Sequence, residues 1–246
     1  MLTKNHSKLI QSLKHKKFRK LYKLFVVEGV KSVKEVLNSS IEVEKIFYVE
    51  EYQDEFKGVF EKHLVSEIEL KKISSMKTPN GVLAVCKMHE RQVFIDENEL
   101  VLALDGINDP GNLGTIIRLA DWFGISKIIC SNDTVDVYNS KVIQATMGSF
   151  SRVSVFYTDL TKFLKNYSNT IFGAFLEGKN IYKEELPSKG MIVMGNESNG
   201  ISKEIEPFIT KKITIPQFGK GITESLNVAT ATSIILSEFK RTSGKK

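Results

Sequence analysis

Short apolar runs alternate with amphipathic segments through the second half of the chain. The run LVLALDGI at 100–107 is almost continuously apolar, as in a parallel strand buried on both faces. The same pattern predicts further strands at 126–131, 153–157, 170–176, 190–195 and 211–216, and helices at 115–124, 140–150, 160–167, 202–209 and 228–239. Alternating strands and helices indicate an α/β domain over 98–246, with a mostly parallel sheet and helices on both faces. Ligands of such sheets bind at the carboxyl ends of the strands, so the loops there are the first place to search.

The first half follows a different pattern and is predicted to be a separate small α/β domain over 1–92. Helical spacing of apolar residues predicts helices at 8–25, 30–40 and 50–63, and β-rich runs predict strands at 25–29, 43–49 and 81–88. The charged segment HERQVFIDENE at 89–99 is interpreted as the linker between the two domains.

Composition narrows the class of protein. The 246 residues are 41% hydrophobic and 26% charged, as in an ordinary globular protein. We expect neither a secretory signal nor a transmembrane helix, because no apolar run is long enough, and we therefore expect a cytoplasmic protein without a membrane partner. Cys86 and Cys130 lie far apart and are predicted to be reduced core residues. The 4 histidines show no metal-ligand spacing, so no metal site is predicted.

Basic residues are concentrated at the N-terminus. The formal net charge is +6, and the first 25 residues contain eight Lys or Arg and no Asp or Glu. Two interpretations of such a run are equally good. It forms either a solvated helix face or a surface that contacts the phosphates of a nucleic acid. The residues predicted to bind RNA if the second reading holds are Lys16, Lys17, Arg19 and Lys20.

Three polar loops follow predicted strands in the second half, and the first is DGINDPGNLG at 105–114. Asn108 to Gly111 are predicted to form a turn, and Asn112 can cap the helix that follows. Arg118 stands out among apolar neighbours on that helix. Because helical side chains lean toward the N-terminus, its guanidinium can approach the loop; pairing with Asp121 is the alternative.

The second and third loops have similar features. In GNESNG, the bracketing glycines let backbone approach a ligand closely, and Glu197 either contacts that ligand or favours the N-terminus of the next helix. In ESLN, Asn227 and Ser225 are both candidate helix caps. Ser225 lacks the features of a hydrolase nucleophile, because no histidine lies nearby in the sequence and the surrounding residues do not form a GxSxG turn.

Taken together, the three loops resemble the three motifs of the SpoU branch of the SPOUT superfamily, the TrmH-like RNA 2′-O-ribose methyltransferases. DPGNLGTIIRLADWFG resembles the first motif, MGNESNGIS the second and IPQFGKGITESLNVATATSII the third, in the family's order. The stretches LFVVEGVKSVKEVL and TPNGVLAV resemble the small RNA-binding domain that many members carry at the N-terminus.

The resemblance implies a deep trefoil knot in the C-terminal domain, a homodimer, S-adenosylmethionine (AdoMet) as cofactor and RNA as substrate, with ribosomal RNA of the 23S type favoured over tRNA. The catalytic residues that it implies are Arg118, Asn112, Glu197, Ser225 and Asn227. The implied cofactor contacts are Gly195, Ile215 and Leu226. In this reading Arg118 grips a phosphate and stabilises the developing alkoxide, acting in its own subunit or in the partner's.

Two rival functions stay open. A non-catalytic RNA-binding protein would need the N-terminal domain but not a complete set of motifs. A Rossmann-type nucleotide enzyme would need the GxGxxG fingerprint, which the glycines of the first loop do not match.

Overall fold

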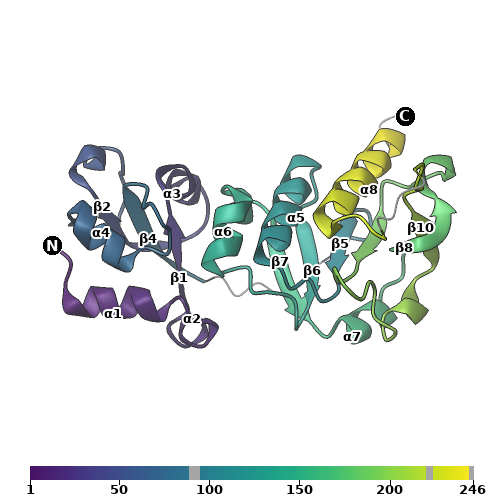
Figure 1. Cartoon of the computed structure of the whole chain (residues 1–246), viewed down its shortest axis with the longest axis horizontal. Helices are drawn as coiled ribbons and strands as arrows, with labels where there is room; N and C mark the ends of the chain where they lie inside the picture. The colour runs from purple at the N-terminus through teal and green to yellow at the C-terminus, as the bar shows by residue number, and fades with distance from the viewer. Residues whose placement is uncertain (89–94, 220–223, 244–246) are drawn as a thin grey trace. The chain divides into compact units, whose positions relative to one another are not determined.

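The computed structural model describes residues 1–88, 95–219 and 224–243, and its contacts divide the chain into two compact units (Figure 1). The first unit contains 1–88 together with 136–152. The second contains 95–135 and the chain from residue 153 onward. The expected linker at 89–99 falls partly outside the described residues. The segment 136–152 groups with the first unit although it lies between strands of the second in the sequence.

The first unit is built on a four-stranded sheet of order β1-β4-β2-β3. Its strands are β1 (Leu24–Glu28), β2 (Val43–Tyr48), β3 (Glu61–Leu64) and β4 (Val82–Lys87). β4 pairs antiparallel with β1 and β2, whereas the edge strand β3 runs parallel to β2. The helices are α1 (Lys4–Ser12), α2 (Lys16–Tyr22), α3 (Val30–Leu37), α4 (Glu67–Ile73) and α6 (Ser140–Thr146).

Each face of this sheet has its own apolar core, because alternate residues of a strand point to opposite faces. In β4, Ala84 and Cys86 contribute to one core and Leu83 and Val85 to the other. The first core also receives Ile143 of α6, which accounts for the grouping of that segment with this unit.

Two predictions for this unit were wrong. The single helix expected over 8–25 is broken into α1 and α2. The segment 50–63, expected to be a helix, instead contains the short 3₁₀ turn Glu50–Tyr52 and the start of the strand β3 at Glu61. The interior glycine at position 58 has a φ of 155°, which is incompatible with a helix and marks the transition.

The second unit contains a fully parallel six-stranded sheet of order β10-β8-β9-β5-β6-β7, as predicted. Its strands are β5 (Leu100–Leu104), β6 (Lys127–Ser131), β7 (Ser154–Thr158), β8 (Ile171–Asn180), β9 (Gly190–Met194) and β10 (Lys211–Thr214). Every residue of β5 and β9 is buried, which explains their uninterrupted apolar sequence.

The helices of the second unit are α5 (Pro110–Trp122), α7 (Leu160–Lys165) and α8 (Val228–Ser243), and α5 and α8 pack side by side (Figure 1). The helix predicted at 202–209 was wrong, since only a 3₁₀ turn forms at Glu206–Phe208, where Pro207 cannot continue an α-helical hydrogen-bond pattern. None of the helices in the described parts of the chain has the length and apolarity that a membrane span requires.

Candidate active site

The first polar loop leads into α5, and Asp109 rather than Asn112 caps this helix. The Asp109 carboxylate accepts a hydrogen bond from the backbone N–H of Asn112 at 2.8 Å, and Pro110 occupies the first helical position. Asn112, which the sequence analysis offered as a cap, is instead the third residue of the helix. The consequence is functional: the Asn112 side chain is not needed for capping and is available for other partners.

Asn227 caps α8, as predicted. Its Oδ1 accepts hydrogen bonds from the N–H groups of Ala229 at 2.9 Å and Thr230 at 3.2 Å. An asparagine that caps through its oxygen keeps both N–H bonds of its amide for other contacts.

A chain of side-chain hydrogen bonds joins the three loops. Asn227 donates through Nδ2 to Oδ1 of Asn112 at 2.9 Å, and Asn112 donates through Nδ2 to Oε1 of Glu197 at 2.9 Å. Asn112 and Glu197 are half-buried, whereas Asn227 is exposed. The structure thus brings together three of the five predicted catalytic residues, from positions up to 115 residues apart. We call Asn112, Glu197 and Asn227 the amide–carboxylate chain.

The loop that carries Glu197 is held in a tight turn. Asn196 and Gly200 exchange two backbone hydrogen bonds of 2.9 Å, and Gly200 has a φ of 68°. At Gly195 a Cβ would lie only 2.2 Å from the carbonyl carbon of Gly200, so only glycine fits. The turn returns the backbone directly over the end of β9 and presents Glu197 to α5.

Two residues that the sequence analysis did not single out anchor these loops to each other. Asn196 donates through Nδ2 to the carbonyl oxygen of Gly106 at 2.6 Å. Asp105, which is buried at the end of β5, accepts a hydrogen bond from the N–H of Ser202 at 2.7 Å. The available signal in the sequence was a polar residue within an otherwise continuous apolar run.

The remaining predicted contacts lie on the same loops. Gly195 directly follows β9, and Ile215 directly follows β10, both at the carboxyl edge of the sheet. Ser225 and Leu226 are exposed just before Asn227, and the Leu226 side chain is 48% accessible. An apolar side chain left open beside backbone polar groups suits a ligand with both apolar and hydrogen-bonding parts.

Arg118 lies away from the amide–carboxylate chain. Six residues beyond Asn112 on α5, it is rotated by about 240° around the helix axis and displaced by about 9 Å along it. It lines a groove of about 660 Å³ between α5 and α8, together with Trp122, Tyr182, Ile234 and Glu238. Trp122 is 84% exposed there. The structure of one chain therefore does not bring Arg118 to the other predicted catalytic residues.

The basic residues predicted to bind RNA separate into two kinds. Lys16, Lys17 and Lys20 are exposed on α2, and we call them the α2 lysines. Beside them, the rings of Phe18 and Tyr22 stack at 6.2 Å. Such a surface combines positive charge with accessible aromatic groups.

Arg19 instead points into the first unit and is 3% exposed. Its guanidinium forms an ion pair with Asp136 at 2.6 Å and donates to the carbonyl oxygens of Leu13 and Lys14 at 2.9 Å each. These partners occupy its donors and hold the turn between α1 and α2 against the segment that contains Asp136. Its surroundings give Arg19 a structural role and do not support the prediction that it contacts phosphate.

Comparisons with family models match both parts of the chain. Residues 99–237 match the SpoU rRNA Methylase family, and residues 4–84 match the MRM3-like substrate binding domain. The first match contains all three loops of the candidate site.

Curated relatives include methyltransferases of 23S ribosomal RNA. The chain is 29% identical over 232 residues to the 23S rRNA (guanosine(2553)-2′-O)-methyltransferase RlmP of Bacillus subtilis, covering 92% of each protein. It is 40% identical over 147 residues to the 23S rRNA (guanosine-2′-O-)-methyltransferase RlmB of Blochmanniella floridana, covering 58% of this chain and 57% of that protein.

Solved structures match over nearly the whole chain. A TrmH-family structure from Porphyromonas gingivalis has a TM-score of 0.90 and 36% identity, covering 99% of this chain and 100% of that one. An AdoMet-bound rRNA methyltransferase from Sinorhizobium meliloti has a TM-score of 0.87 and 29% identity, covering 98% and 96%.

Proposed function

Because the chain belongs to the SpoU rRNA methylase family, we propose that it transfers a methyl group from AdoMet to a ribose 2′-hydroxyl of RNA. The observation that carries this proposal is the amide–carboxylate chain. It joins all three motif loops at the carboxyl edge of a parallel sheet, where ligands of such sheets bind.

The loops at this edge have the chemistry that AdoMet requires. Gly195 lies where backbone crowding admits no side chain, Ile215 follows β10, and Leu226 exposes an apolar surface. Adenine needs apolar contact and backbone hydrogen bonds, and these three positions are the proposed cofactor contacts. When bound, AdoMet supplies an electrophilic methyl group on a sulfonium.

The chain's own residues would position the substrate hydroxyl. A ribose hydroxyl is a weak nucleophile, so its orientation and the removal of its proton limit the rate. Asn112, Glu197 and Asn227 bring amide and carboxylate groups together, and Ser225 lies two residues before Asn227. These four residues are proposed to orient the ribose. Each amide is held by its neighbour, so the donors are pre-organised.

Arg118 is proposed to act in the active site of a partner subunit, in a homodimer formed through the groove between α5 and α8. Arg118 lies in this groove, on a different face of α5 from Asn112, and Trp122 is exposed beside it. A second copy of the chain would cover Trp122. The Arg118 guanidinium of one subunit would then contact a phosphate and the developing alkoxide in the active site of the other. An arginine suits that role because it stays charged.

The trefoil knot is also part of the proposal. β10 lies at one edge of the sheet, whereas α8, the next helix, packs against α5, which follows β5 at the interior of the sheet. The return of α8 from the edge strand β10 to a position beside α5 supports a threaded C-terminal segment.

The substrate is proposed to be 23S-type ribosomal RNA, which the curated relatives modify, and the N-terminal domain, about residues 1–92, is proposed to bind it. The α2 lysines would contact phosphates, and the stacked pair of Phe18 and Tyr22 offers a surface for unpaired bases. Residues 98–246 would form the catalytic domain. A cytoplasmic location is also proposed, supported by the similarity to bacterial 23S rRNA methyltransferases.

The test of this function is methyl transfer from labelled AdoMet to purified ribosomal RNA and, separately, to tRNA. Wild type is compared with Arg118→Ala, and the product nucleotide is identified by mass spectrometry. We expect a 2′-O-methyl nucleotide in ribosomal RNA that the variant does not form. Methyl transfer to tRNA alone would show that the assignment of ribosomal RNA as substrate is wrong. If the wild-type protein does not bind AdoMet, a non-catalytic RNA-binding protein is favoured.

A mixing experiment tests the action of Arg118 across the dimer. Arg118→Ala and Glu197→Gln are each expected to be inactive as homodimers. When they are unfolded and refolded together, half of the dimers are mixed, and each mixed dimer has one site with both residues intact if Arg118 acts on the partner. About a quarter of the wild-type activity should return. No recovery, with mixed dimers demonstrated by mass spectrometry, would place Arg118 in its own subunit's site.

A further inference from the structure

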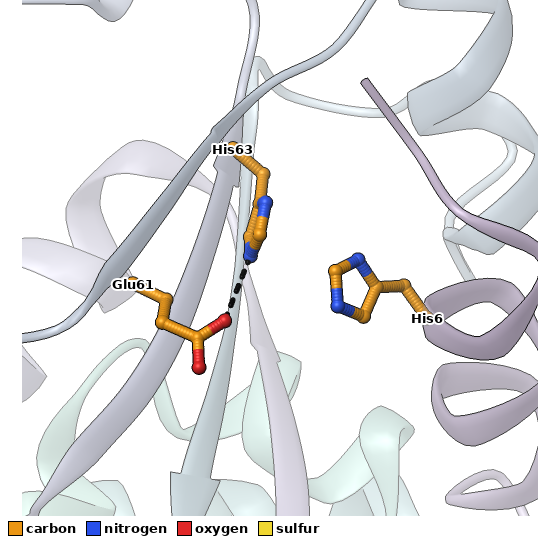
Figure 2. A group of neighbouring side chains, drawn as sticks. All are labelled: His6, Glu61 and His63. Atoms are coloured by element: carbon orange, nitrogen blue, oxygen red, sulfur yellow. Dashed lines mark hydrogen bonds and ion pairs between the residues drawn. The ribbon is translucent and has the colours of Figure 1, made fainter.

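Two histidines and a glutamate from distant parts of the sequence meet on the surface of the first unit (Figure 2). His6 lies on α1, and Glu61 and His63 lie on the edge strand β3. Being two residues apart on a strand, Glu61 and His63 point to the same face. One nitrogen or oxygen of each residue lies within 4.8 Å of the others.

The two imidazole rings are held in place by the core beneath them. His63 stacks on Phe47 with a centroid distance of 4.8 Å and an interplanar angle of 18°, and His6 contacts the same ring edge-on at 5.3 Å. Phe47 is fully buried. Packing of this kind restricts ring rotation, so ligands are ordered before anything binds.

Two neighbours orient the Glu61 carboxylate. Lys45 pairs with Oε1 of Glu61 at 2.7 Å, while Oε2 of Glu61 faces His63 Nε2 at 3.3 Å. One carboxylate oxygen is thus directed toward His63, and the other is paired with Lys45.

We propose that His6, Glu61 and His63 bind a divalent transition-metal ion of the zinc class. Two imidazoles and one carboxylate, completed by water, form a common four-coordinate zinc set, whereas calcium and magnesium prefer oxygen ligands alone. Zinc bonds of about 2.0–2.1 Å in a tetrahedron separate the ligand atoms by about 3.3 Å. The distance between His63 Nε2 and Glu61 Oε2 already has this value at 3.3 Å, and the ligand atom of His6 lies within 4.8 Å of the other two.

The bound ion would act as a cross-link between α1 and β3. β3 pairs with β2 on one side only and is the edge of its sheet, and α1 carries the His6 ligand. Metal binding to the folded state alone stabilises it, so the unit should unfold at a higher temperature with zinc.

The test uses the full-length chain after treatment with a chelator. Zinc chloride is titrated by calorimetry, with magnesium chloride as the comparison ion, and thermal unfolding is followed with and without zinc. The variants are His6→Gln and His63→Gln. His15→Gln is the matched control, because His15 is an exposed histidine of the same unit outside the cluster.

We expect one zinc ion per chain, a rise in unfolding temperature that the chelator reverses, and affinity weakened by about 100-fold or more in both cluster variants but not in the control. Circular dichroism of the metal-free variants separates lost binding from lost folding. Absence of stoichiometric zinc binding by the wild type, or equal losses in the control, would overturn the proposal.

Discussion

The hydrogen bond between Asn112 and Glu197 can be tested by an isosteric substitution. Asn112→Asp replaces the donating Nδ2 by an oxygen of the same size and keeps the oxygen that accepts from Asn227. Two carboxylates then face each other at the 2.9 Å that separates Asn112 Nδ2 from Glu197 Oε1. The variant loses a charge-assisted hydrogen bond and gains a repulsion.

Magnitudes decide the net effect of this change. At 2.9 Å the repulsion of two unit charges is about 1.4 kcal/mol in water and about 6 kcal/mol at an effective dielectric constant of 20. Both residues are half-buried, so the lower end applies, and the lost hydrogen bond adds about 1.5 kcal/mol. The carboxylate that Asn112→Asp introduces lies in the first turn of α5, where its interaction with the helix dipole stabilises the folded state by about 0.5 kcal/mol. We expect the free energy of unfolding to fall by about 2 kcal/mol.

Urea unfolding at fixed protein concentration, followed by far-UV circular dichroism, measures this change. Asn132→Asp makes the same chemical change at an exposed position of the same unit and should alter stability by less than about 0.5 kcal/mol. The double variant Asn112→Asp with Glu197→Gln restores the bond with donor and acceptor exchanged and should regain most of the loss. An unchanged stability for Asn112→Asp, or no recovery in the double variant, would refute the paired geometry.

Three further predictions follow from the structure. Replacing the α2 lysines by Ala should weaken RNA binding and reduce the slope of log affinity against log salt by about 2 for single-stranded RNA, and equal slopes for wild type and variant would contradict this role of the lysines. Arg19→Ala should instead destabilise the first unit by about 3 kcal/mol, because it leaves Asp136 without its ion-pair partner. Gly195→Ala should reduce both stability and AdoMet binding, because its Cβ would lie 2.2 Å from Gly200; wild-type unfolding temperature would show that the turn is looser than described. Burial raises the pKa of the Cys86 and Cys130 thiols, so both should react with a thiol reagent only after unfolding, and rapid labelling of the native chain would count against their burial.

The sequence by itself determined the class of fold and the positions of the motif loops. Three features could be predicted from short stretches of sequence: the buried strand at 100–107, the order of strands and helices after it, and the Asn227 cap. Each depends on an apolar run or a capping residue whose partners are neighbours in the chain. The three motifs were recognisable for the same reason, since each is a continuous stretch.

Only the tertiary structure decided which side chains meet. Asn112 was expected to cap α5, but the competing cap Asp109 released it to bridge Glu197 and Asn227. Arg19 carries the same charge as the exposed lysines beside it in the sequence. Its burial depends on the ion pair with Asp136, a residue far away in the chain.

The histidines make the same point most clearly. His6 and His63 have no motif spacing, and the strand that carries His63 was predicted to be a helix, which would have directed Glu61 and His63 to different faces. Side-chain periodicity is a property of a single element, whereas a cluster needs the packing of α1 against the sheet that contains β3. That packing depends on contacts between residues far apart in the chain, which a local pattern does not record.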